Sequence, residues 1–183
     1  MNVEYQRLCA EEVKGLLNKG LIKESISPWN CYGFYVNKNS EQVRGIPRLV
    51  VNYKPLNKFL VDDTYSIPNK TSLVTRIAGA KIFSKFDLKS GFWQVAIKEE
   101  DKFKTTFNVL AGQYEWNVMP FGLKNAPSKF RRVMDDTLKP YFDWLIVYID
   151  DILVFSSSVD QHFKSSQEIS ANSQASRPSI FKK

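Results

Sequence analysis

The stretch WLIVYIDDILVFS, residues 144–156, decides the fold. It is an apolar run that only the adjacent acids Asp150 and Asp151 interrupt. β-Branched residues flank the acids on both sides, and the run is too short to cross a bilayer as a helix. This pattern predicts two buried strands that meet at a tight turn, with both acids at the turn.

Two adjacent carboxylates in an apolar environment need a positive partner, because burial and mutual repulsion both disfavour their charged forms. No Lys or Arg occurs within residues 144–156. A divalent metal would supply the missing charge, and Mg²⁺ prefers one or two carboxylates together with phosphate and water oxygens. The alternative is that the aspartates only make the turn, since Asp is a common turn residue.

A third acid, Asp87, ends the strand-like run KIFSKF and precedes the turn-like residues 89–91. Two strand-end acid sites in one small sheet can converge on a shared pair of metal ions. Paired metals serve in-line phosphoryl transfer, because one activates the attacking oxygen and the other stabilises the leaving oxygen. The residues alone therefore allow a metal-dependent phosphotransferase or nuclease.

The rest of the chain mixes helical and strand-like patterns. Periodicity predicts helices over 3–19, 70–78 and 126–138, a hairpin from strands 33–36 and 47–53, further strands over 81–88, 92–97, 104–109 and 112–118, and irregular chain over 54–69. Residues 165–183 contain six Ser and no Leu, Val, Tyr or Trp, and predict disorder.

Composition narrows the function further. The chain has 183 residues, one His and two Cys, which disfavours His-based triads, disulfide frameworks and four-ligand zinc sites. The formal net charge is +7, and residues 32–61 carry five basic side chains against Glu41 alone. That excess suits a polyanion such as nucleic acid or a nucleoside triphosphate, although a solvated basic face explains it equally well. No apolar signal core begins the chain, so we expect an intracellular protein with no membrane partner.

Several segments, taken in order, resemble reverse transcriptases. FSKFDLKSGFWQV (83–95) is similar to the first catalytic motif of that family, VMPFGLKNAPSKF (118–130) to the loop and helix that follow, and YIDD (148–151) to its two-aspartate motif. Upstream, SPWN (27–30), FYVNK (34–38) and PRLVVNYKPLN (47–57) resemble the fingers. The details are most similar to plant pararetroviruses of the caulimovirus type, with gypsy-type retrotransposons as near neighbours.

The resemblance implies an α+β fold of right-hand polymerase fingers and palm. It implies an antiparallel palm sheet with helices on one face, and no thumb. The expected ranges are an N-terminal helix and lead-in over 1–31, fingers over 32–80, palm over 81–164 and a tail outside the family over 165–183.

The resemblance also implies residue roles. Asp87, Asp150 and Asp151 fall on the catalytic metal-binding carboxylates, and the carbonyl of Leu88 on a further metal contact, for two Mg²⁺ ions with Mn²⁺ as a substitute. The remaining expected roles are dNTP phosphate binding by Lys38 and Arg48, exclusion of a ribose 2′-hydroxyl by Phe92, packing near the nucleotide by Phe121, and nucleic-acid contacts by Gly122, Lys124 and Arg131. Without the motif, each of these has a simpler explanation as surface charge or core packing. His162, the lone histidine, receives no role.

The implied activity is RNA-directed DNA synthesis on an RNA or DNA template–primer, with dNTP as substrate. Because the thumb and RNase H segments are not expected in these residues, an impaired polymerase fragment is one interpretation. An inactive remnant of an integrated viral element, which at most binds nucleic acid or another protein, is the alternative. The sequence leaves the host and the oligomeric state open.

Overall fold

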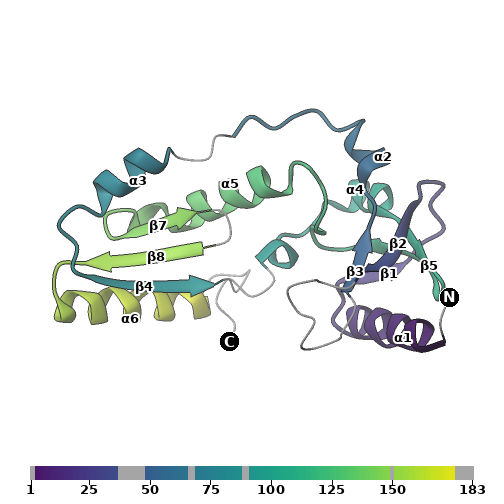
Figure 1. Ribbon diagram of the computed structural model, residues 1–183, viewed down its shortest axis with the longest axis horizontal. Helices are drawn as coiled ribbons and strands as arrows, with labels where there is room; N and C mark the ends of the chain where they lie inside the picture. The colour runs from purple at the N-terminus through teal and green to yellow at the C-terminus, as the bar shows by residue number, and fades with distance from the viewer. Residues whose placement is uncertain (1–2, 37–47, 66–68, 88–90, 149–150, 176–183) are drawn as a thin grey trace. The chain divides into compact units, whose positions relative to one another are not determined.

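The computed structural model describes residues 3–36, 48–65, 69–87, 91–148 and 151–175 (Figure 1). The helices are α1 (Val3–Asn18), α2 (Lys54–Asn57), α3 (Lys70–Arg76), α4 (Glu99–Lys102), α5 (Ala126–Leu138) and α6 (Val159–Ala175). The strands are β1 (Ile22–Glu24), β2 (Cys31–Val36), β3 (Arg48–Val51), β4 (Ile82–Asp87), β5 (Phe107–Val109), β6 (Gly112–Trp116), β7 (Leu145–Tyr148) and β8 (Asp151–Ser156). No helix within these ranges is long and apolar enough to cross a membrane.

The chain forms two compact units whose sequences interleave. Unit 1 comprises residues 1–61 and 95–126, and unit 2 comprises residues 62–94 and 127–183. Unit 1 holds a five-stranded sheet of order β1-β6-β5-β2-β3, and unit 2 a three-stranded sheet of order β4-β8-β7. The predicted α+β class with antiparallel pairing is confirmed, with one parallel pair, β2–β5.

This division differs from the expected ranges 32–80 and 81–164. Strands β5 and β6 pair with β1 and β2 rather than with the strands that carry the acids. All three residues of β1 pair with the second half of β6, from Ile22 opposite Trp116 to Glu24 opposite Tyr114. Proximity in sequence to the acidic strands is therefore a poor guide to pairing here.

The core of unit 1 forms beneath α1. Cys9, Val13 and Leu16 recur at helical spacing and are each at most 5% exposed, together with Phe107 at 0%. Gly20 ends the helix with φ at 67°, a left-handed conformation that suits glycine, as the sequence predicts. The N–H of Leu21 then donates to the carbonyl of Leu16, which turns the chain into β1.

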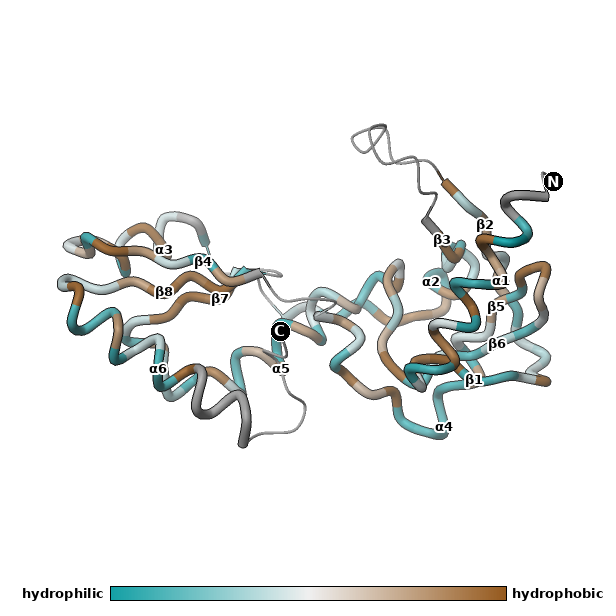
Figure 2. Tube along the Cα trace, turned by 90° about the horizontal axis from the view of Figure 1, so that it is seen from below, coloured by the Kyte–Doolittle hydropathy of each residue, from teal (hydrophilic) through white to brown (hydrophobic). Residues whose placement is uncertain are grey.

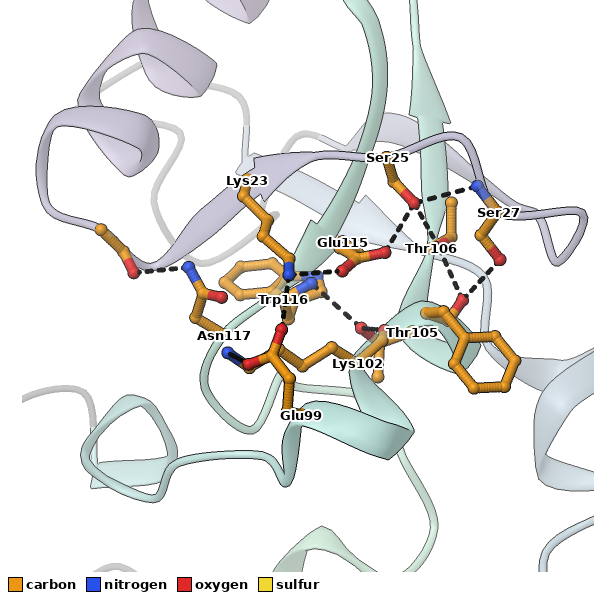
Figure 3. A network of polar contacts seen from close by, with 12 residues as sticks. Lys23, Ser25, Ser27, Glu99, Lys102, Thr105, Thr106, Glu115, Trp116 and Asn117 are labelled. Carbon is orange, nitrogen blue, oxygen red and sulfur yellow. Dashed lines mark hydrogen bonds and ion pairs between the residues drawn. The ribbon is translucent and has the colours of Figure 1, made fainter.

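A polar network joins β1, β6 and α4 in unit 1 (Figure 3). The Lys23 ammonium lies 2.7 Å from Glu99 and 3.2 Å from Glu115, and Ser25 donates to Glu115 at 2.6 Å. Glu115 is only 8% exposed, so its charge needs these partners. The ammonium groups of Lys102 and Lys23 lower the pKa of Glu99 to about 2. The network therefore gives a buried carboxylate its polar partners and ties α4 to the sheet.

The sheet of unit 2 is antiparallel throughout, and its two faces differ. Leu145, Val147, Ile152 and Val154 lie on one face and are at most 1% exposed. Figure 2 shows α6 along the sheet, and the His162 ring on that helix contacts the hydroxyls of Ser84 at 2.7 Å and Ser156 at 3.2 Å. The expected arrangement, helices on one face of an antiparallel sheet, is confirmed. The lone histidine, which the sequence left without a role, anchors α6.

Three expectations about secondary structure are wrong. The range 54–69 is not irregular throughout, because Lys54–Asn57 form the short helix α2, with a proline in its first turn. Residues 92–97 do not form a strand, because Gly91–Gln94 make a 3₁₀ turn and only Ala96 bridges to Val118. A Cβ at Gly91 would lie 2.8 Å from Cζ of Phe130, so this glycine lets the turn pack closely on α5. Residues 165–175 continue α6 rather than being disordered, since Ser165 and Ile169 are buried at i, i+4 spacing. Residues 176–183 lie outside the described chain.

Candidate active site

The register of β4 and β8 places two of the predicted acids opposite each other. Asp87 is the last residue of β4, Asp151 is the first of β8, and the two are direct backbone partners. Tyr148, the last residue of β7, is the partner of Asp151 on its other side. Directly opposed positions of a sheet project to the same face. The fold thus brings together acids that are 64 residues apart in the chain.

The composition of this strand end suits a hard cation. Carboxylate oxygens are the donors that Mg²⁺ prefers, and the Asp151 side chain is 40% exposed, so water and phosphate can reach it. Asp150 and Leu88, which the resemblance adds to the metal ligands, lie outside the described residues. Among the side chains that are described, no group of three or more His, Cys, Asp or Glu gathers to hold a metal.

A lysine partner of Asp151 lies on the neighbouring strand. Nζ of Lys85 in β4 is 2.8 Å from Oδ2 of Asp151. This cation lies outside residues 144–156, which themselves contain no Lys or Arg, so the local sequence around Asp151 does not indicate it. The available signal was the alternation along β4, since Lys85 lies two residues before Asp87 and therefore shares its face.

Phe92 lies in the 3₁₀ turn that follows β4. It is 8% exposed, and its ring meets that of Phe130 edge to face, with the centroids 5.3 Å apart. This is the packing of a core aromatic residue, the simpler of the two explanations that the sequence allowed. Its predicted role in sugar selection stays a prediction.

Arg131, expected to contact nucleic acid, takes part in a largely buried ion pair of unit 2. It is 8% exposed, its Nε lies 2.7 Å from Asp135, and Nη1 donates to the carbonyl of Val147 at 2.6 Å. These contacts use Nε and Nη1 of the guanidinium, and the predicted role of Arg131 toward nucleic acid stays a prediction. Arg131 connects α5 to β7, the strand that ends at Tyr148, two residues before the adjacent aspartates in the sequence. The helical period of residues 126–138 was the signal, because Arg131 lies three residues before Met134 and seven before Leu138, both of which are buried.

A second group of charges fixes the segment before α3 to α5. The Tyr65 hydroxyl donates to Asp135 at 2.8 Å, and Asp63 pairs with Lys129 at 3.1 Å and with Arg132 at 3.2 Å. The backbone N–H of Tyr65 and then the Lys129 ammonium hold the pKa of Asp63 below its ordinary value. These partners of α5 lie 65–70 residues away in the chain, so no local pattern in the sequence indicates them.

The residues expected to contact nucleotide and nucleic acid around Gly122 lie in a loop of unit 1. Gly122 has φ at 95°, and its carbonyl accepts from the Asn57 amide at 2.9 Å. Asn57 also accepts from the backbone N–H of Lys124 at 3.0 Å, so one side chain holds the loop at both ends. Phe121 and Lys124 are exposed at this loop. Their roles toward nucleotide and template stay predictions.

Of the two residues expected to bind triphosphate, the structure describes Arg48, which lies in unit 1. Arg48 begins β3 opposite Val36 of β2, which confirms the predicted hairpin strands. Lys38 lies outside the described residues. The assignment of both to triphosphate binding is carried by the resemblance alone.

Comparison with known protein families decides the identity of the fold. The family model described as reverse transcriptase (RNA-dependent DNA polymerase) matches residues 36–182. The chain belongs to the reverse transcriptase family. The match continues through most of the segment 165–183, which sequence analysis had set apart from the family.

Relatives among characterised proteins are plant virus polyproteins. The chain is 51% identical over 164 residues to the genome polyprotein of Petunia vein clearing virus (isolate Shepherd), covering 90% of this chain and 8% of that protein. It is 50% identical over 152 residues to the enzymatic polyprotein of Cauliflower mosaic virus (strain Strasbourg), covering 83% of this chain and 22% of that protein. The predicted likeness to pararetrovirus reverse transcriptases is confirmed. This chain corresponds to a small part of each polyprotein.

Solved reverse transcriptases share the fold. The foamy viral protease-reverse transcriptase in complex with RNA/DNA hybrid matches with a TM-score of 0.80 and 25% identity, over 92% of this chain and 22% of that one. A form of it in complex with double-stranded DNA matches with a TM-score of 0.79 and 26% identity, over 92% and 29% of the two chains. The predicted fold of polymerase fingers and palm is confirmed.

We predict that Arg131→Met destabilises the reverse transcriptase domain by about 3 kcal/mol, because it leaves Asp135, whose side chain is only 15% exposed, without its cation. Arg132→Met removes the same charge from the next position of α5, where the side chain is 49% exposed, and is expected to cost less than about 1 kcal/mol. Urea unfolding followed by circular dichroism measures both. Equal stability of the two variants would contradict the structural role of Arg131.

Proposed function

We propose that this chain is the catalytic part of an RNA-directed DNA polymerase, which joins a dNTP to a primer 3′-hydroxyl by two-metal nucleotidyl transfer. The observation that carries the proposal is the pairing of Asp87 with Asp151 across β4 and β8. Membership of the reverse transcriptase family supports the reaction type. The partner follows from the complexes of the foamy viral enzyme with RNA/DNA hybrid and with double-stranded DNA.

Carboxylate donors at one strand end fit divalent cations, so the metal ligands we assign are Asp87, Asp150, Asp151 and the carbonyl of Leu88. Two Mg²⁺ ions held there, or Mn²⁺ in their place, would supply an activated 3′-hydroxyl and neutralisation of the triphosphate charge. The protein itself positions the acids: the β4–β8 ladder fixes positions 87 and 151, and α5 holds β7 through Arg131 and Val147.

The remaining assignments concern the nucleotide and the template. Lys38 and Arg48 bind the triphosphate, Arg48 with the forked geometry that suits phosphate oxygens. Phe121 packs near the nucleotide, and Gly122 and Lys124 meet the template–primer backbone. Arg131 is left out of this set because its guanidinium is buried and bound to Asp135.

The experiment that tests the function is incorporation of a single dNTP into a labelled primer on RNA and DNA templates with Mg²⁺. We predict that Asp151→Asn lowers the rate by more than about 100-fold, because metal stabilisation of the transferring phosphoryl group contributes several kcal/mol and about 1.4 kcal/mol is tenfold in rate. Asp143→Asn is the matched control, since Asp143 is an exposed acid of the same unit before β7 and should leave the rate within about twofold.

Two outcomes would contradict this proposal. Equal rates in the two variants would remove Asp151 from the catalytic set. Template–primer binding by a folded wild-type chain that incorporates no nucleotide would favour a nucleic-acid-binding module instead. Melting curves of each variant beside the wild type exclude unfolding as the cause of a lost rate.

We also predict that Phe92→Val raises incorporation of ribonucleotides relative to deoxynucleotides by about tenfold or more, if the ring excludes a 2′-hydroxyl sterically. Phe92 packs on Phe130, so the variant is first checked for a cooperative melt. Phe130→Leu removes the partner ring without opening the predicted sugar contact and serves as the control. The same ratio of ribo- to deoxynucleotide incorporation in wild type and Phe92→Val would assign Phe92 to the core alone.

A further inference from the structure

The strand end that carries the acids has an electrostatic problem that exists before any metal binds. Acids occupy positions 87 and 151, which are direct partners in the β4–β8 ladder. Like charges directly opposite each other destabilise a sheet. A chain that folds without metal therefore needs another cation at this point of the sheet.

Lys85 is placed to be that cation. It is the partner of Leu153, so it lies diagonally across from Asp151 and two residues before Asp87 on the same strand. Positions two apart on a strand share a face, and diagonal neighbours lie within reach of long side chains. The 2.8 Å distance between Nζ of Lys85 and Oδ2 of Asp151 shows that the two side chains form an ion pair.

The contact is also reversible. The Lys85 side chain is 64% exposed and that of Asp151 is 40% exposed, so the flexible stem can swing into solvent without leaving a buried group unpaired. An ammonium 2.8 Å from Oδ2 of Asp151 repels a divalent cation that approaches the same carboxylate, and it occupies part of the space around that oxygen. Lys85 and a metal at Asp151 therefore compete.

We propose that Lys85 is a positioning residue that serves as the built-in counter-ion of Asp151. It neutralises and orients the carboxylate in the metal-free chain, and it yields the carboxylate oxygen when a divalent cation binds. The consequence is a weaker and more readily reversed metal affinity than the acids alone would give. This inference rests on the metal site of the proposed function and adds to it a residue that regulates the occupancy of that site.

The test is a titration of the full chain with Mn²⁺, with free Mn²⁺ followed by its electron paramagnetic resonance signal and with no nucleotide or template present. Lys85→Met keeps much of the stem and removes the charge, and we expect it to bind Mn²⁺ about fivefold more tightly, because a neighbouring positive charge no longer opposes the ion. Lys85→Arg keeps the charge and should restore an affinity close to that of the wild type.

Lys81→Met is the matched control. Lys81 directly precedes β4 at the end opposite Asp87, and its backbone N–H donates to Ser156. The substitution changes the net charge of the protein by the same amount but leaves the acidic end untouched, so the affinity should change by less than about twofold. An equal gain in Lys81→Met and Lys85→Met would show a general charge effect and overturn the inference.

Melting temperatures with and without Mg²⁺ provide a second test, which still works if a Lys85 variant is less stable than the wild type. Without metal, Lys85→Met should melt below the wild type, and saturating Mg²⁺ should raise its melting temperature by more than it raises that of the wild type. Lys85→Gln, with a polar end group, gives the same comparison with less loss of stability. If Mg²⁺ raised the melting temperatures of wild type, Lys85→Met and Lys85→Gln equally, the Lys85–Asp151 contact would be an ordinary surface ion pair and the inference would be overturned.

Asp151→Asn separates failure of this inference from failure of the proposed function. If it binds Mn²⁺ as tightly as the wild type, the metal site is wrong and both proposals fall. If it loses affinity while Lys85→Met stays at the wild-type value, the metal site stands and only the role of Lys85 is refuted.

Discussion

The pairing of Asp87 with Asp151 is the constraint on which the site depends. Side chains alternate along a strand, so a slip of one residue between β4 and β8 would send one acid to the opposite face. What prevents the slip is the apolar face of the same sheet. Ile152 and Val154 must stay buried, and Leu145 and Val147 of β7 must stay with them. Burial on one face therefore sets the chemistry on the other.

Two cations of unit 2, Arg131 and Lys85, differ in burial and therefore in role. Arg131 is buried and committed to Asp135 and Val147, where it serves the position of β7. Lys85 is exposed and holds Asp151 by a contact that solvent can break. Removal of a buried partner is costly, whereas an exposed pair contributes little to stability. The first cation is thus suited to a permanent contact and the second to an exchangeable one.

Local sequence patterns predicted an element correctly where its apolar residues follow one clear helical or strand period. The residues of α1 and α5, the β2–β3 hairpin, and the two strands around the acids all follow from apolar spacing and turn residues. Which strands pair is harder to predict than where the strands lie. β5 and β6 join β1 and β2 in one sheet, and no local sequence pattern indicates this. The aromatic run 92–97 has strand-forming residues, yet the close contact of Gly91 with Phe130 bends it into a turn. In α6, two buried positions among many serines were too sparse to show a period.

At the site, the sequence identified the acids by motif and left their cations unidentified. Lys85 and Arg131 have the same formal charge, and only the ladder and the burial of α5 distinguish their roles. Long-range partners such as Asp63 and Lys129, or His162 and Ser84, depend on how elements pack, which a single sequence does not state. The resemblance to reverse transcriptases indicated which residues matter, and the structure adds how the described ones are held.

The most direct test of this account is the strand register in solution. A nuclear Overhauser experiment on the isotope-labelled chain should give cross-strand backbone contacts that pair residue 87 with residue 151 and residue 85 with residue 153. A pattern shifted by one residue, which pairs 87 with 152, would place the acids on opposite faces of the sheet. That result would contradict both the shared metal site and the competition at Asp151.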